Sequence, residues 1–121
     1  YCHIMKTAQP WEDAIKKELK QARQARAMGN EGKARVCARR AAGVAIAEYV
    51  TRQNLPNPGP SAYARLQFIA SHSGSAPRAR EISQHLILRV NEEFKLPIDA
   101  DIISETQELV QILLGLTFSA E

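Results

Sequence analysis

Residues 11–52 read WEDAIKKELKQARQARAM-GNEG-KARVCARRAAGVAIAEYVTR, and this stretch decides the fold. Over Trp11–Met28, apolar residues recur at three- and four-residue steps, which is typical of one face of an amphipathic helix. Gly29–Gly32 interrupts this pattern and is typical of a short turn. Lys33–Arg52 is predicted to form the second helix. Because only four residues join two long helices, we expect them to form an antiparallel hairpin.

The second helix is rich in small side chains, among them Ala34, Cys37, Ala38, Ala41 and Ala42. Small side chains let helix axes approach closely, so this helix is expected to lie at the centre of the packing. With only two cysteines in the chain, a disulfide framework is excluded, and Cys37 is predicted to be a buried small residue. A reducing, cytoplasmic setting is the simpler expectation.

The remaining sequence predicts three shorter helices. Three prolines in the segment 53–60 indicate a loop, and the third helix is expected over Ala62–Ala70. A fourth helix is predicted to begin after a capping Ser75, with Pro77 in its first turn, and to run to about Phe94. Either Asp99 or Asp101 is expected to cap the fifth helix, which ends near Gly115.

No segment shows the sustained alternation of apolar and polar residues that strands require. We therefore predict an all-α, up-and-down bundle of about five helices, formed by residues 1–121 as a single domain. Residues 1–8 are expected to be flexible or in part added by cloning. A membrane span is not expected, since no run of 18 apolar residues occurs.

Charge is distributed unevenly along the chain. Residues 1–52 hold 11 basic and 5 acidic side chains, residues 53–90 hold 4 and 1, and residues 91–121 hold 1 and 7. Two interpretations remain open. The two ends can neutralise each other within the fold, or the basic part can face an anionic partner such as RNA or a nucleotide.

The predicted fourth helix carries a histidine among arginines. Arg78 and His85 are seven residues apart and so lie nearly on one line of the helix, as does Arg89, whereas Arg80 points about 140° away from His85. A histidine between two cations is expected to stay neutral and could act as a base. A neutral histidine can take a proton from a ribose 2′-hydroxyl while an arginine stabilises the phosphate, with no metal or cofactor. Alternatively, His85 is a packing residue and the arginines are solvated.

A second basic group lies on the predicted second helix, at Arg35, Arg39 and Arg40. One interpretation is that these arginines, with Lys33 nearby, bind an anion. The other is that they pair with the acidic side chains of the fifth helix, namely Asp101, Glu105 and Glu108. No metal-binding spacing of His, Cys, Asp or Glu is present in the sequence.

The chain resembles the HEPN family (higher eukaryotes and prokaryotes nucleotide-binding domains). The likeness lies in its size, its order of helices, the segment Gly32–Ala42, and the Arg80–His85 spacing, which is similar to the family's motif of an arginine, four to six residues and a histidine. Arg78 to His85 matches the longer limit. The resemblance implies that His85, with Arg80 or Arg78 from a dimer partner, is the catalytic pair of a ribonuclease. Other members of the family are inactive partners of nucleotidyltransferases in toxin–antitoxin pairs.

Three functions are therefore compatible with the sequence. The leading hypothesis is a regulatory module that binds RNA, a nucleotide or a protein partner such as a nucleotidyltransferase. The second is a metal-independent ribonuclease, and the third is a non-catalytic dimerisation domain. A homodimer is expected because the fourth and fifth helices carry wide apolar faces, including Ile87 and Leu88.

Overall fold

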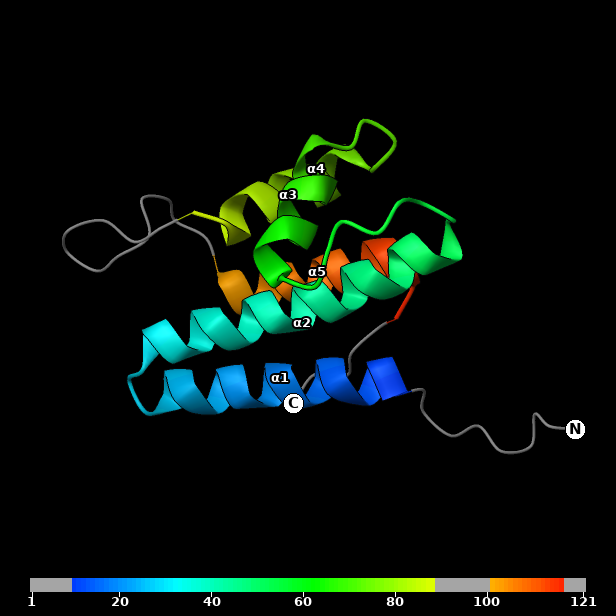
Figure 1. Cartoon of the computed structure of the whole chain (residues 1–121). Coiled ribbons are helices and arrows are strands. Elements are labelled where there is room, and N and C mark those ends of the chain that lie inside the picture. The colour runs from blue at the N-terminus through cyan, green and yellow to red at the C-terminus, as the bar shows by residue number, and fades with distance from the viewer. Residues whose placement is uncertain (1–9, 89–100, 117–121) are drawn as a thin grey trace, which may run out of the picture.

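The computed structural model of the chain describes residues 10–88 and 101–116. These residues form five α-helices and no strand, which confirms the predicted all-α bundle (Figure 1). The helices are α1 (Pro10–Ala27), α2 (Glu31–Arg52), α3 (Ala62–Ser71), α4 (Pro77–Leu86) and α5 (Ile102–Leu114). None of them combines the length and apolar character that crossing a membrane requires.

The α1–α2 hairpin forms as predicted, and its turn is fixed by local hydrogen bonds. Gly29 has a φ of 79°, a backbone conformation that suits glycine. The side chain of Asn30 accepts a hydrogen bond from the backbone N–H of Lys33 and so caps α2. The second helix therefore begins at Glu31, two residues earlier than expected.

Helix α2 lies between two hydrophobic clusters. Figure 1 shows α1 along one side of α2, with α3 and α4 on the other side and α5 behind. One cluster joins Ala38, Ala42, Ile46 and Val50 of α2 to buried residues of α3, α4 and α5. The other cluster joins Cys37, Ala41 and Ala45 to α1 and α5. The predicted central position of this helix and the burial of Cys37 are both confirmed.

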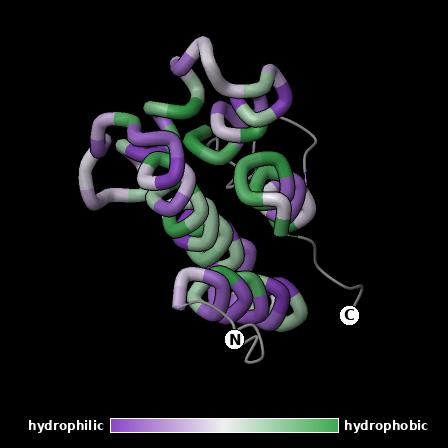
Figure 2. The backbone as a smooth tube through the Cα atoms, turned by 90° about the vertical axis from the view of Figure 1, so that its right-hand side faces the viewer, coloured by the Kyte–Doolittle hydropathy of each residue, from purple (hydrophilic) through white to green (hydrophobic). Residues whose placement is uncertain are grey.

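The side of α1 that faces away from α2 carries mainly polar residues. Figure 2 shows α1 as the lowest helix, with hydrophilic residues along most of its length. Only four of its residues are buried, Ile15, Leu19, Ala22 and Ala25, and they form the stripe that packs against α2. This leaves the lysines of α1 facing solvent.

Helix α4 departs from the prediction at both ends. Its N-cap is Ala76, not Ser75, and no side chain caps it, although Pro77 does occupy the first turn. The helix ends at Leu86, eight residues before the predicted end at Phe94. Arg39 accounts for this early end, because its guanidinium donates to the carbonyls of Leu86 and Leu88. Those carbonyls would otherwise accept hydrogen bonds from the next helical turn.

Helix α5 begins and ends at residues that the sequence indicates. Asp101 is the cap, and its carboxylate accepts hydrogen bonds from the backbone N–H groups of Ile103 and Ser104. Gly115 closes the helix in the left-handed conformation, with a φ of 72°. The partly buried aromatic side chains of Tyr49 and Trp11 pack against the two clusters.

Gly43 sets the distance between α2 and α3. A Cβ atom at this position would lie 3.1 Å from the Cβ and 3.3 Å from the Cα of Ala62, closer than ordinary contacts. A branched side chain would have to push α3 away from α2. We therefore expect Gly43→Val to lower the free energy of unfolding by about 2 kcal/mol in urea denaturation.

Gly32→Val is the matched control, because Gly32 also lies in α2 but a Cβ there would meet nothing closer than 3.8 Å. This variant should change stability by less than about 0.5 kcal/mol. Equal effects at the two glycines would contradict the close approach of α3 to Gly43.

Candidate functional site

Arg78 lies inside a group of carboxylates that links α4 to α5. Its Nε donates to Glu108 at 2.9 Å, its Nη1 to Glu81 at 2.9 Å, and its Nη2 lies 3.4 Å from Glu105. The hydrogen bonds to Glu108 and Glu81 raise the pKa of Arg78, and the hydrogen bond from Arg78 lowers the pKa of Glu108. Arg78 thus holds two helices together with its donors already engaged.

His85 belongs to the same group. Its Nδ1 lies 2.7 Å from a carboxylate oxygen of Glu105, and its Nε2 lies 4.0 Å from one of Glu81. Because Arg78 and His85 both contact Glu105, the prediction that they share a face of α4 is confirmed. The two charged side chains that contact His85 among the described residues are carboxylates, and the flanking of His85 by two cations stays a prediction. Arg89 lies outside those residues.

This arrangement orients the imidazole but surrounds it with negative charge. An Nδ1–H that donates to Glu105 leaves Nε2 as the atom that could accept a proton. The atom is near Glu81, and the group as a whole holds three carboxylates against Arg78. A phosphate brought to the Nε2 atom would lie near Glu81, and Arg78, the cation that this group has among the described residues, is already engaged by carboxylates.

Arg80 lies apart from this network. In the described part of the chain its side chain makes no hydrogen bond or ion pair, and the Nε atom is buried without a partner there. Its helical position places it about 140° from His85, so one chain does not bring the two together. Ser83, one turn further along α4, is fully buried and its hydroxyl also has no partner.

The arginines of α2 do not all have the same neighbours in the structure. Arg39 is half-buried, and its Nε and Nη2 lie 2.6 Å and 2.9 Å from the carbonyl oxygens of Leu86 and Leu88. Burial lowers the pKa of Arg39, and the neighbouring charge of Arg35 lowers it further. Arg40 is exposed and lines a pocket between α1 and α2. Arg39 and Arg40 therefore lie in different surroundings, whereas Arg35 is close enough to Arg39 for its charge to act on it.

The alternative prediction, that these arginines pair with the acids of α5, is wrong for the residues that the structure describes. Asp101 instead accepts from Arg26 at 2.8 Å, and Glu105 and Glu108 contact Arg78. Burial works to raise the pKa of Asp101, but hydrogen bonds from Arg26 and Ser104 outweigh it and lower the pKa. The acids of α5 are thus neutralised by residues outside α2.

Arg40 lines a pocket near the turn of the α1–α2 hairpin, which we call the turn pocket. The pocket has a volume of about 590 Å³. Its cations are Lys33 and Arg40, and neither forms an ion pair among residues 10–88 and 101–116. Its lining contains no acidic residue and consists of Gln21, Gln24, Ala25, Met28, Asn30, Lys33 and Arg40.

No functional prediction from the sequence fell on Gln21, Gln24, Met28 or Asn30. A usable signal was present, since Gln21 and Gln24 are three residues apart on α1, and Lys33 and Arg40 are seven apart on α2. In an antiparallel hairpin these two pairs meet near the turn. No group of three or more His, Cys, Asp or Glu residues in the described ranges could hold a metal ion.

Comparisons of the chain with protein-family models, with curated proteins and with solved structures found no match.

The role of Arg39 leads to a prediction about stability. Replacing Arg39 with leucine leaves the carbonyls of Leu86 and Leu88 without their donor while keeping an apolar stem at this half-buried position. We expect the free energy of unfolding to fall by about 2 kcal/mol, measured by urea denaturation. Arg40→Leu is the control and should change it by less than about 0.5 kcal/mol. A loss at Arg40 as large as that at Arg39 would contradict this role.

The Arg78 network predicts a dependence of stability on pH. Because the folded pKa of Glu108 is depressed, its contribution is present above the unfolded pKa and is lost as the pH falls through the folded value. We expect Arg78→Met to be less stable than the wild type at pH 7, with the difference shrinking between about pH 5 and pH 3.

Arg80→Met is the matched control for this titration, since Arg80 lies on the same helix without an ionic partner among the described residues. Its difference from the wild type should not change with pH over that interval. A constant difference for Arg78→Met would show that the network contributes nothing through charge.

Proposed function

We propose that this helical bundle is a binding module for a phosphate-bearing ligand, RNA or a nucleotide, and that the turn pocket is its phosphate site. The proposal rests on the absence of ion pairs at Lys33 and Arg40. Both line the turn pocket, and neither forms an ion pair with a carboxylate in the described part of the chain. Cations left without acidic partners are the feature that attracts phosphate groups.

The other side chains of the turn pocket suit the same kind of ligand. The amides of Gln21, Gln24 and Asn30 offer donors and acceptors that can bond to phosphate, sugar or base edges. Met28 is 85 % exposed and provides an apolar surface at the rim, where a base could lie. Lys17 and Lys20 are exposed on α1 and extend the positive charge along the helix.

The α4–α5 network supports the same choice of site. Arg78 has its donors engaged by three glutamates, so it is a poor receptor for an added phosphate. The acids of α5 are paired within the fold, whereas Lys33 and Arg40 form no ion pair among the described residues. These two side chains therefore place positive charge at the turn pocket.

The ribonuclease remains a second candidate because of two observations. Glu105 orients the ring of His85, and Arg80 has no ionic partner within the described residues. A second copy of the chain could bring its own Arg80 to the Nε2 atom of His85, where it would offset the carboxylate of Glu81. The homodimer is a finer proposal that rests on the apolar residues of α4 and α5 and on the HEPN resemblance, and measurement of the oligomeric state would test it. The nucleotidyltransferase partner rests on the resemblance, and co-purification would test it.

The binding proposal predicts the effect of charge removal. We expect a fluorescently labelled single-stranded RNA to bind the wild type with an affinity that falls steeply with salt, as measured by fluorescence anisotropy. The double variant Lys33→Gln/Arg40→Gln should bind about tenfold or more weakly, and its salt dependence should correspond to about two fewer phosphate contacts.

The control is Lys16→Gln/Arg52→Gln, which removes the same charge away from the turn pocket, where Lys16 pairs with Glu12 and Arg52 with Glu48. It should bind almost as the wild type does. Equal losses in the two double variants would mean that net charge alone drives binding and would overturn the turn pocket. RNA cut in excess EDTA by the wild type, but not by His85→Ala, would establish the ribonuclease instead.

A further inference from the structure

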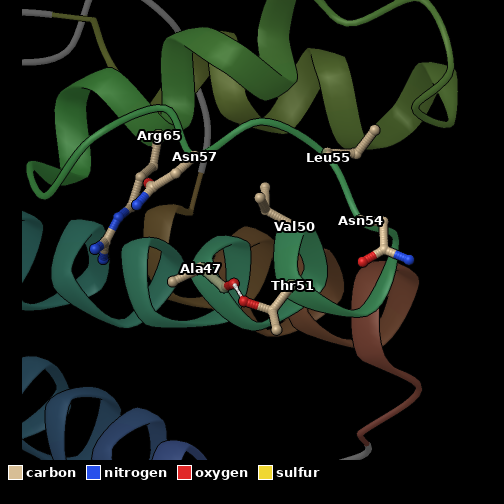
Figure 3. A pocket seen from close by; sticks show the side chains of 7 residues that line it. All are labelled: Ala47, Val50, Thr51, Asn54, Leu55, Asn57 and Arg65. Atoms are coloured by element: carbon tan, nitrogen blue, oxygen red, sulfur yellow. Dashed lines mark hydrogen bonds between the residues drawn. The ribbon is translucent and has the colours of Figure 1, made fainter.

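A second cavity lies toward the other end of α2, beneath the proline-rich loop that leads to α3. Its volume is about 350 Å³, and it is lined by residues of α2, of the loop and of α3. Figure 3 shows its side chains, with Val50 in the middle, Arg65 and Asn57 together at one end and Leu55 and Asn54 at the other. We call it the loop pocket.

Arg65 supports the wall of this pocket by holding two backbone segments. Its Nε donates to the carbonyl of Gly59 in the loop at 2.9 Å, and its Nη1 donates to the carbonyl of Gly43 in α2 at 3.2 Å. The side chain of Asn57 accepts from the backbone N–H of Gly59 at 2.9 Å and so fixes the same turn of the loop. The guanidinium is therefore held in place before any ligand arrives.

These two bonds leave part of the guanidinium unused. A guanidinium has five N–H donors, and Arg65 directs two of them to carbonyl oxygens among the described residues. Asn57 uses its oxygen toward Gly59, which leaves its amide N–H groups as further donors. No carboxylate lines the loop pocket, so nothing within its lining neutralises Arg65.

The rest of the lining is apolar or already satisfied. Ala47, Val50 and Leu55 contribute apolar surface, and the hydroxyl of Thr51 donates to the carbonyl of Ala47 at 3.0 Å. Small-molecule sites typically combine such apolar walls with a few polar groups that converge at one end. Here the converging groups are donors, and one of them is charged.

We propose that the loop pocket binds a small organic carboxylate, with the carboxylate at Arg65 and Asn57 and a compact apolar body over Ala47 and Val50. A planar carboxylate matches the parallel N–H groups of a guanidinium. A polyphosphate fits this lining less well, since Arg65 is its one cation and the rest of its surface is amide or apolar. This ligand is separate from the phosphate-bearing ligand proposed for the turn pocket.

The test uses phenylacetate as the probe and phenylacetamide as its neutral counterpart. Each is titrated into the uniformly ¹⁵N-labelled wild-type chain, and backbone amide shifts are followed by NMR. We expect saturable shifts with phenylacetate, largest at Ala47, Thr51, Asn54 and Asn57, with a Kd of about a millimolar. Phenylacetamide should bind at least about fivefold more weakly, because it lacks the charge that Arg65 binds.

Variants locate the site independently of this comparison. Ala47→Leu fills the floor of the loop pocket and should abolish the phenylacetate shifts, whereas Ala27→Leu, which adds the same side chain at an exposed position of α1, should leave them unchanged. The acid and amide comparison needs no variant, so the proposal stays testable if Ala47→Leu unfolds. Equal binding of acid and amide, shifts centred on other residues, or no saturable shift would each overturn it.

Discussion

The fold depends on the close approach of neighbouring helices to the small side chains of α2. Alanine, cysteine and glycine occupy the buried positions of its first three turns and centre, so α1, α3 and α5 can pack against it. Small side chains contribute little area each, but they bring the larger residues of the surrounding helices into contact, among them Ile15, Leu19, Leu66, Leu109 and Val110. Gly43 is the closest point of this packing, because α3 begins directly against it.

Because other helices cover α2 on two sides, the position of each charged residue on α2 determines which helix its side chain contacts. Arg39 emerges beside the end of α4 and holds its last carbonyls. Lys33 and Arg40 emerge at the edge shared with α1 and remain without carboxylate partners in the described ranges. The acids of α5 face α4 and the end of α1, where Arg78, His85 and Arg26 meet them. The packing of the helices thus places the acids of α5 beside basic partners, and it leaves Lys33 and Arg40 without ion pairs among the described residues.

Local patterns made much of the fold predictable. Several signals that each extend over a few residues mark the helix bounds that the structure shows. They are the apolar spacing of residues 11–28, the glycines near residue 30, and the caps Asp101 and Gly115. The end of α4 could not be read in this way. It depends on Arg39, which precedes Leu86 by 47 positions, and no local signal marks that contact.

The candidate site was harder to predict for the same reason. Helical spacing placed Arg78 and His85 on one face, but their carboxylate neighbours come from α5, whose packing the spacing does not give. The arginines of α2 were grouped by their nearness in sequence, whereas the adjacent Arg39 and Arg40 point about 100° apart on the helix and so meet different neighbours.

The central claim is that Lys33 and Arg40 of the turn pocket bind a phosphate-bearing ligand, and that the network around His85 does not. The most direct measurement is a map of backbone amide shifts when a short single-stranded RNA is added to the ¹⁵N-labelled chain in EDTA. The account predicts the largest shifts at Gln21, Gln24, Lys33 and Arg40. Shifts centred on Arg80, His85 and Glu105 would contradict it and would place the ligand at the histidine.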